Sequence, residues 1–319
     1  MSETASRSHD LVSIVIPCYK GARFLPAAIE SCLQQTYPHL EILVVDDCSP
    51  DDCAVIAEDY ARKDPRITVI RRSQNGGVSA AFNSGFCVAT GAYYTRLAQD
   101  DVFAPNAIEV MVHHLEQHPD LGLVYMDYQV IDESGKVIGY AAVPGPDEVL
   151  SWRNALGLCV MWRRKVWETV GEFDSAFDTA EDFDYWLRIS QRFPIGRCDG
   201  HAPLFVRVHA GMGTVCFADR QETATLRVLR RHFQGSRFLT RRWFLQRKAL
   251  AYALCSNASL YTLSGKQVKA LLNILYSFLL WPFPYRPAES LNRHKLFALA
   301  LLRFFQPYPL FRKSRFTTG

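Results

Sequence analysis

The feature that most constrains the fold of this chain is a regular alternation of short apolar runs with helical patterns over the first 118 residues. Apolar runs, mostly rich in β-branched residues, occur at 11–17, 41–47, 66–72 and 92–98. Helical patterns follow each run, at 24–35, 53–63, 77–89 and 106–118. Strands that alternate with helices of this length are typical of βαβ units. The sequence therefore predicts an α/β fold with a mostly parallel sheet, right-handed crossovers and helices that flank the sheet.

The pattern changes twice further along the chain. Between 121 and 220 it is mixed, with a hairpin predicted to turn at Ser134-Gly135 and a helix predicted to end at Gly171. After residue 220 it is helical, basic and aromatic. We therefore expect a polar N-terminal tail at 1–10, a catalytic or binding domain at 11–220 and a helical C-terminal region at 221–319.

Composition places the chain in a class. Of its 319 residues, 49% are hydrophobic and 21% are charged, as in a globular protein with a sizeable core. The first ten residues include no apolar segment of the kind found in a secretory signal. The nine cysteines form no CxxC pair, so we expect buried thiols in a reducing cytosol rather than a metal site.

Charge is divided unevenly along the chain. Residues 1–220 carry 19 Lys/Arg against 30 Asp/Glu, a net charge of −11, and residues 221–319 carry 17 against 2, a net charge of +15. Such a basic region is attracted to an anionic surface, either nucleic acid or a membrane leaflet. No nucleic-acid recognition motif accompanies it, so we expect no nucleic-acid partner.

The C-terminal region also carries apolar runs, and these favour a membrane surface. The run at 270–283 is 14 residues long and includes Asn273 and Ser277, which makes it shorter than the roughly 20 residues of a spanning helix. Trp281 and Phe283 lie close to Arg286, a combination typical of the headgroup interface. We therefore expect peripheral binding to the anionic inner face of the plasma membrane. The alternative is a helical subdomain that packs on the rest of the protein.

Polar or aromatic residues follow the predicted strands. Pro17 and Tyr19 follow the first, Asp46 and Asp47 end the second, and the loop "SQNGG" follows the third. The fourth ends in two adjacent acids, Asp100 and Asp101. Ligands of open parallel sheets bind beyond the carboxyl ends of the strands. Two carboxylates there could hold Mg²⁺ or Mn²⁺ against the phosphates of a nucleotide, although an isolated acid pair more often caps a helix. Neither G-x-G-x-x-G nor a P-loop motif is present.

A second group of acids begins a later helix. Glu181, Asp182 and Asp184 open the amphipathic stretch "EDFDYWLRIS". Acids at this place interact favourably with the helix dipole, and one of them could instead act as a general base toward a hydroxyl group. His209, which follows a predicted strand, could complete the coordination of a metal ion.

The segments "VSIVIPCYKGARFLPAAIESCLQQTYPHLEILVVDDCSPDD", "NGGVSAAFNSGFCVATGAYYTRLAQDD", "VGEFD", "AEDFDYWLRIS" and "RVH" together resemble the family 2 inverting glycosyltransferases. The resemblance extends from about residue 11 to 210. It implies the GT-A fold, a Rossmann-like, mostly parallel sheet flanked by helices, here with a C-terminal basic and aromatic helical extension. Gln99 precedes the acid pair, so the adjacent acids must serve in place of the family's spaced D-x-D form.

The resemblance implies roles for individual residues. Pro17 and Tyr19 would border the nucleotide base, Asp47 would contact it with Asp46 alongside, and Asn75 and Gly76 would lie near the ribose and diphosphate. Asp100 and Asp101 would hold the divalent cation, with Asp101 preferred as the direct ligand and His209 as the third ligand that some members of the family have. Asp182 would be the catalytic base, with Glu181 as a possible support. The segment at 157–164, which includes Met161 and Trp162, would line the donor sugar and acceptor.

These observations predict an inverting transferase that moves a sugar from a nucleoside-diphosphate donor, UDP-linked, to an acceptor hydroxyl. The acceptor would be a glycan or a lipid-linked molecule of cell-envelope polysaccharide assembly, and the cofactor would be Mn²⁺ or Mg²⁺. Two alternatives are a metal-dependent nucleotidyltransferase and a catalytically silent nucleotide-sugar-binding subunit. The intact set of acids argues against the silent subunit.

Overall fold

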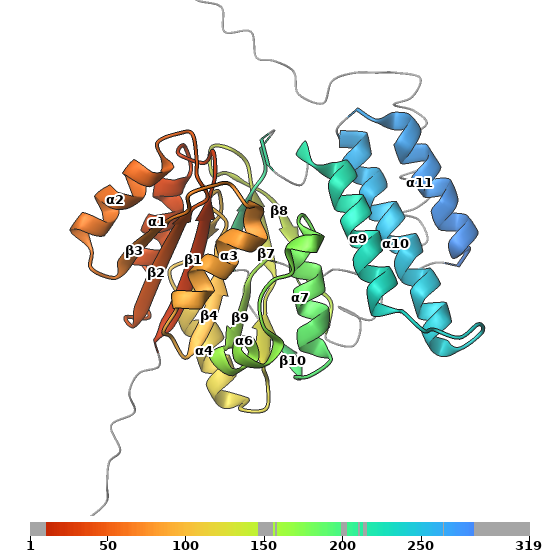
Figure 1. Cartoon of the computed structure of the whole chain (residues 1–319), viewed down its shortest axis with the longest axis horizontal. Helices are drawn as coiled ribbons and strands as arrows, with labels where there is room; N and C mark the ends of the chain where they lie inside the picture. The colour runs from red at the N-terminus through yellow and green to blue at the C-terminus, as the bar shows by residue number, and fades with distance from the viewer. Residues whose placement is uncertain are drawn as a thin grey trace, which may run out of the picture. The chain divides into compact units, whose positions relative to one another are not determined.

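The structure is a computed structural model that describes residues 11–145, 156, 158–198, 203–209, 211–212, 216–263 and 265–283. The chain divides into two compact units (Figure 1). Unit 1 comprises residues 1–150 and 154–209, and unit 2 comprises residues 151–153 and 210–319. Among the described residues, no helix is both long enough and apolar enough to cross a membrane.

Unit 1 is built around a seven-stranded sheet of order β10-β6-β9-β4-β1-β2-β3. Neighbouring strands are parallel except for β9, which is antiparallel to both β4 and β6. The strands of this sheet are β1 (Val12–Cys18), β2 (Leu40–Asp46), β3 (Ile67–Arg71), β4 (Tyr93–Arg96), β6 (Leu123–Tyr125), β9 (Val160–Arg163) and β10 (Ile195–Arg197). The predicted mostly parallel sheet is confirmed.

A second, smaller sheet has the order β5-β11-β7-β8. Along the chain, its strands are interspersed with those of the large sheet. Its strands are β5 (Val102–Phe103), β7 (Tyr128–Ile131), β8 (Val137–Ala141) and β11 (Leu204–Arg207). β7 and β8 form the predicted hairpin, whose turn contains Gly135 with a φ of +89°. β11 pairs with β5, so the end of β11 is held next to the segment that follows β4.

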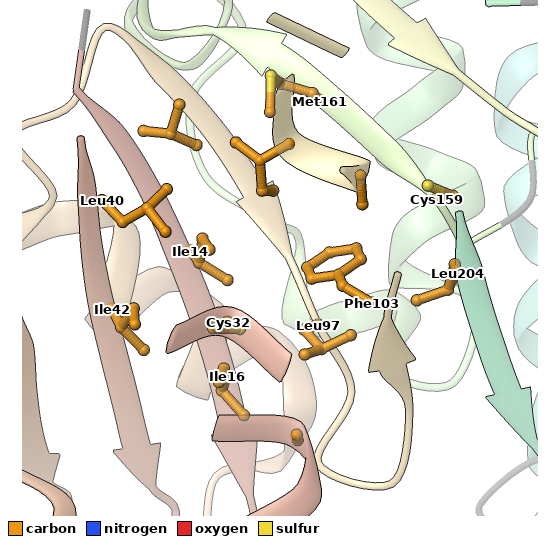
Figure 2. Close-up of a cluster of buried hydrophobic side chains, with 14 of the residues drawn as sticks. Ile14, Ile16, Cys32, Leu40, Ile42, Leu97, Phe103, Cys159, Met161 and Leu204 are labelled. Carbon is orange, nitrogen blue, oxygen red and sulfur yellow. The ribbon is translucent and has the colours of Figure 1, made fainter. Parts of the chain in front are cut away.

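Helices cover both faces of the large sheet. The helices are α1 (Leu25–Leu33), α2 (Cys53–Lys63), α3 (Gly77–Val88), α4 (Ala107–Gln117), α6 (Arg164–Val170), η1 (Ser175–Phe177) and α7 (Glu181–Ser190). Apolar residues of α1, α2 and α4 pack with Val12, Ile14 and Ile16 of β1 in one cluster. Figure 2 shows part of it, with Ile14 and Ile16 of β1 near Cys32 of α1. Val15, which points to the other face, lies against Gly85 of α3. The alternation of side chains along β1 thus serves two layers of helices, which is why its sequence is apolar throughout.

β9 corrects one prediction. Met161 and Trp162 were expected to line the donor sugar and acceptor, but both side chains are fully buried. Met161 belongs to the cluster shown in Figure 2. Trp162 points to the opposite face, where its ring packs on those of Phe86 and Trp186 at centroid distances of 5.1 and 5.6 Å. Both residues are core residues because β9 lies between two other strands with helices on each face.

Unit 2 contains three helices, α9 (Ala218–His232), α10 (Arg241–Leu263) and α11 (Gln267–Leu280). The N-terminal parts of α9 and α11 are joined by Asp219, which bonds with Lys266 just before α11 and accepts from Lys269 at 2.6 Å. The beginning of α10 lies beside the end of α11, because Arg247 donates to the carbonyl oxygens of Leu279 and Leu280 at 3.2 and 3.0 Å. The predicted helical character of this region is confirmed for its described part.

Candidate functional site

The loops after β1 and β2 meet at the carboxyl edge of the large sheet. Cys18 pairs with Asp46 in register, so both strands end at the same level. The Lys20 amide donates to the Ser49 hydroxyl at 2.7 Å, and the Ala22 amide donates to Asp51 at 3.0 Å. Asp51 is partly desolvated, yet its hydrogen bonds from Ser49 and Ala22 lower its pKa to about 2, so it holds this loop as a carboxylate.

Asp47 joins the end of β2 to the loop after β3. Its buried carboxylate accepts from the Arg72 guanidinium at 2.5 Å and from the amides of Gly76 and Gly77 at 3.0 and 2.9 Å. The Asn75 side chain donates to the Asp47 carbonyl at 3.2 Å. The structure thus brings together Asp47, Asn75 and Gly76, which were predicted to surround the nucleotide. The three donors to the Asp47 carboxylate fix this loop at the end of β2, and its predicted contact with the base stays a prediction. The Asp46 carboxylate is likewise engaged, by the Ser49 amide at 3.0 Å.

Gln99 fastens the loop after β1 to the loop after β4. Its side-chain oxygen accepts from the Tyr19 amide at 2.8 Å, and its side-chain nitrogen donates to the Tyr19 carbonyl at 3.0 Å. Gly21 makes this approach possible, because a Cβ atom there would lie 2.0 Å from the Gln99 side-chain oxygen. Tyr19 remains 39% exposed and is therefore accessible to a ligand. Sequence reasoning noted Gln99 only as the residue that breaks the D-x-D spacing.

The two adjacent acids after β4 have different surroundings. Asp100 lies beside His209, with its Oδ2 2.9 Å from the His209 Nε2, and both side chains are partly exposed. Asp101 is buried, and its Oδ1 accepts from the Arg207 amide at 2.9 Å. Desolvation, strengthened by the neighbouring Asp100 carboxylate, raises the pKa of Asp101. Asp100 is thus the acid with solvent access beside His209, and the direct coordination of a metal ion by Asp101 stays a prediction.

The Asp100 and His209 pair fits a divalent cation in chemistry and in spacing. Adjacent ligands of an octahedral ion with bonds of about 2.1 Å lie roughly 3 Å apart, close to the 2.9 Å observed here. A carboxylate with an imidazole suits Mn²⁺ better than Mg²⁺. Within the described residues, no group of three or more His, Cys, Asp or Glu side chains could hold a metal ion by itself.

Arg207 positions both acids and was missed by sequence reasoning. Besides its amide bond to Asp101, its guanidinium donates to the carbonyls of Asp100 at 3.0 Å and of Asp132 at 3.1 Å. The guanidinium also lies 5.0 Å from the ring centroid of Phe24. The only signal was the segment "RVH", in which this arginine stands two residues before His209.

The acids at the start of α7 separate by role. Asp184 forms an ion pair with Arg188 at 2.8 Å, one turn further along the same helix. Glu181 is buried, and desolvation together with the Asp182 carboxylate raises its pKa. Asp182 is about one-fifth exposed, and its Oδ1 accepts from the Phe183 amide at 2.6 Å. Of the three, Asp182 has the solvent access that a general base needs.

Arg96 connects the two acidic groups. Its Nη2 lies 3.3 Å from Oδ2 of Asp182, and its charge also acts on the buried Glu181 and Asp101. The side chain is nearly buried, with its guanidinium 5.5 and 5.7 Å from the ring centroids of Phe82 and Trp186. Arg96 therefore fixes the Asp182 carboxylate from the end of β4. No local sequence signal identifies this role, because the partner is 86 residues away.

Comparisons with known proteins agree with this arrangement. Residues 13–160 match the family model described as glycosyl transferase family 2. An uncharacterized glycosyltransferase of Rickettsia conorii is 33% identical over 229 residues, which are 67% of this chain and 37% of that protein. Chondroitin synthase of Escherichia coli is 30% identical over 186 residues, which are 58% of this chain and 27% of that protein. The chain spans only 20–37% of the length of the first three curated relatives.

Solved structures show the same fold. The mannosyltransferase PcManGT of Pyrobaculum calidifontis, in complex with GDP-Man and Mn²⁺, aligns with a TM-score of 0.62 and 18% identity over 94% of this chain and 82% of that one. Residues 1–349 of Staphylococcus aureus TarS, in complex with UDP, align with a TM-score of 0.55 and 16% identity over 86% and 93% of the two chains. The fold is therefore GT-A, and the chain belongs to glycosyl transferase family 2.

Proposed function

We propose that this chain transfers a sugar from a UDP-sugar to an acceptor hydroxyl with inversion at the anomeric carbon. The observation that carries the proposal is the position of the Asp182 side chain. It is partly exposed and is held by Arg96 at the end of β4. The family match, and the presence of UDP, UDP-GlcNAc or GDP-Man in the complexes of proteins with this fold, support a nucleotide-sugar donor. We favour UDP among the nucleotides.

Asp182 would act as the general base. Its Oδ2 would accept the proton of the acceptor hydroxyl while the hydroxyl oxygen attacks the anomeric carbon on the face opposite the leaving diphosphate. One displacement of this kind inverts the configuration and needs no covalent nucleophile. Arg96 would orient the carboxylate before the acceptor binds, because the guanidinium is itself packed near the rings of Phe82 and Trp186.

Asp100 and His209 would hold the divalent cation, whose charge stabilises the departing diphosphate when it is bound. The chain's own contribution is to fix these two side chains. Phe24 packs on the His209 ring with a centroid distance of 4.9 Å, and Arg207 holds the Asp100 carbonyl. Tyr19 would border the base, and Pro17, Asn75 and Gly76 with Asp46 and Asp47 would complete the loops around the nucleotide.

The base assignment is tested by exchanging each neighbouring acid for its amide. We expect Asp182→Asn to keep UDP binding and to reduce transfer about 10²–10⁴-fold, the usual contribution of a general base. Glu181→Gln is the matched control, because Glu181 is buried and should retain most activity. Transfer to a range of acceptors and UDP binding by calorimetry are the two measurements. Activity lost in the Glu181 variant and kept in the Asp182 variant would assign the base to Glu181.

The metal assignment is tested in the same way. We expect Asp100→Asn to weaken Mn²⁺-dependent UDP binding by at least the 10–100-fold that follows the loss of a supporting group around a metal. Asp101→Asn keeps the shape of a buried side chain, so its Mn²⁺ dependence should persist even if its stability falls. Calorimetric titration of UDP with and without Mn²⁺ decides between them. A selective loss in the Asp101 variant would restore the preference drawn from the sequence.

We further propose that the acceptor is a glycan or a lipid-linked molecule of cell-envelope polysaccharide assembly, and that the enzyme works on the inner face of the plasma membrane. The net charge of +15 in residues 221–319 and the bacterial sources of the curated relatives support this setting. Hydrolysis of UDP-sugars with Mn²⁺, in the absence of acceptor, would separate the transferase from a nucleotidyltransferase and from a silent binding subunit.

A further inference from the structure

One end of unit 2 exposes several large apolar side chains. At this end, α9 is connected to α10 and α11 ends. Phe238 and Leu239 in the connection are 73% and 61% exposed, and Phe244 in the first turn of α10 is 44% exposed. Leu279 near the end of α11 and Phe283 just after it are 73% and 63% exposed. The contacts of Arg247 with the carbonyls of Leu279 and Leu280 hold the α10 and α11 parts of this group together. We name these five residues the apolar tip.

The apolar tip continues along one face of α11. Val268, Leu272, Leu275 and Tyr276, which recur at helical spacing, are all about half exposed. The opposite face of the same helix is buried and consists of Ala270, Asn273, Ile274 and Ser277. Ala270 and Ile274 pack in the core of unit 2, with Leu271 and Phe278 against them. Leu272 and Leu275 face outward in addition, so α11 exposes more apolar surface than a helix surrounded by water usually does. Small residues at helix contacts with apolar residues outside are typical of helices in lipid.

Within the described residues of unit 2, the charged side chains in and next to the apolar tip are basic. Arg237, Arg241 and Arg242 are exposed in or next to the connection. No Asp or Glu occurs between Glu222 and Glu289 in the sequence, so no acid within the described residues 223–283 opposes them. The acids that do belong to α9, Asp219 and Glu222, contact Lys266, Lys269 and Asn273 at the beginning and middle of α11. An apolar tip with an arginine rim is complementary to an anionic lipid surface, where acyl chains lie below acidic headgroups.

The backbone of the connection presents the tip at some cost. Leu239 has a φ of +59°, a left-handed conformation that is rare for a leucine. Leu239 is 61% exposed, so burial of its side chain does little to offset the strain of this backbone conformation. Beside it, the ring of Phe238 packs edge-on against Trp243 at 4.9 Å, and the Arg247 guanidinium lies 5.0 Å from the centre of the Trp243 ring. Tryptophan next to arginine is the combination that settles at the headgroup level.

We propose that the apolar tip, with Arg237, Arg241 and Arg242 around it, inserts into the headgroup region of an anionic bilayer and is the membrane-contacting surface of this chain. The inference rests on the proposed membrane association and assigns it to particular residues. Residues of the tip would replace water by acyl chains, and the arginines would remain at the level of the acidic headgroups. The α11 face that continues from the tip would lie along the same boundary.

The experiment is co-sedimentation of the full chain with vesicles of phosphatidylcholine alone or with 30 mol% phosphatidylglycerol, a composition of about one acidic lipid in three chosen for its surface charge. The apolar variant is Phe238→Ser with Leu239→Asn, since asparagine tolerates a positive φ. The charge variant is Arg237→Gln with Arg241→Gln. Matched controls in unit 1 are Val137→Ser with Ile138→Asn, which are 49% and 57% exposed, and Arg62→Gln with Lys63→Gln.

We expect the unsubstituted chain and both controls to bind the anionic vesicles. The charge variant should bind roughly 30-fold more weakly, about fivefold for each arginine. The apolar variant should bind at least about tenfold more weakly, because two apolar side chains that would be buried in lipid are lost. Mn²⁺-dependent UDP binding should be unchanged in all variants, which shows that unit 1 remains folded.

Other outcomes have distinct meanings. Equal binding by the variants and the unsubstituted chain would overturn the inference while leaving membrane association in place. If the unsubstituted chain did not bind anionic vesicles, both the inference and the proposed membrane association would be overturned. The proposed transfer reaction would not be affected by that result. Self-association of the chain in the absence of lipid, abolished in the apolar variant, would assign the tip to a contact between copies instead and would also overturn the inference.

Discussion

At the scale of single residues, the site depends on close contacts between loops that are far apart in sequence. The amide of Gln99 replaces the hydrogen bonds that the backbone of Tyr19 would otherwise make with water. Gly21 leaves the room for that amide. A glycine is required there because of the neighbouring side chain and not because of a turn conformation, since its φ is not positive.

This contact predicts a non-additive pair of substitutions. Gly21→Ala should displace the Gln99 amide and weaken UDP binding, because the loop that carries Tyr19 loses two hydrogen bonds worth about 1 kcal/mol each. Gln99→Ala should weaken UDP binding by a similar amount through the same loss. In the double variant we expect the two effects to overlap rather than to add, as for residues that share one interaction. Strict additivity in calorimetric titrations would show that the two residues act separately.

At the scale of elements, α7 carries a buried acid whose environment makes stability depend on pH. The pKa of Glu181 is raised from its ordinary 4.5 to about 8, first by burial and then by the Asp182 carboxylate. Between these values the unfolded chain loses the proton while the folded chain keeps it. The folded state therefore binds more protons, and its free energy of unfolding falls as the pH rises through this window.

Glu181→Gln removes this dependence while keeping the shape of the side chain. Between pH 5 and pH 8, we expect the stability of the variant to fall less than that of the unsubstituted chain. The melting temperature of the variant relative to that of the unsubstituted chain should therefore rise with pH. Thermal unfolding followed by circular dichroism at several pH values measures this. Parallel curves for the two proteins would mean that Glu181 is already ionised in the folded state.

The elements of unit 1 could largely be predicted from the sequence, whereas the contacts of the site could not. β1, β2, α2 and α3 follow from apolar periodicity, which is a local signal. The bonds of Arg96 to Asp182 and of Arg207 to Asp101 join residues that are 86 and 106 positions apart. Such pairs depend on the order of strands in the sheet, to which periodicity is insensitive. The burial of Met161 and Trp162 was missed for the same reason, since the insertion of β9 between β4 and β6 is a property of topology.

At the scale of the whole molecule, two compact units differ in charge, in secondary structure and in core. Unit 1 has its own two sheets and a large apolar cluster. Unit 2 has a separate core around Ala258, Tyr261 and Ile274. Units with separate cores can unfold separately, in which case a single melting temperature does not describe the chain.

We expect calorimetric unfolding of the full chain to show two transitions. UDP with Mn²⁺ should raise the temperature of only one of them, because a ligand stabilises the unit whose native state it binds, by about 2.7 kcal/mol at a hundred times its Kd. A chain that ends at residue 209 should show that transition alone, with the same shift, which assigns it to unit 1. Anionic vesicles should affect the other transition and leave the first in place. A single transition that moves as one with UDP would mean that the units fold as a single cooperative body, and the division between a nucleotide-binding unit and a lipid-binding unit would then have to be abandoned.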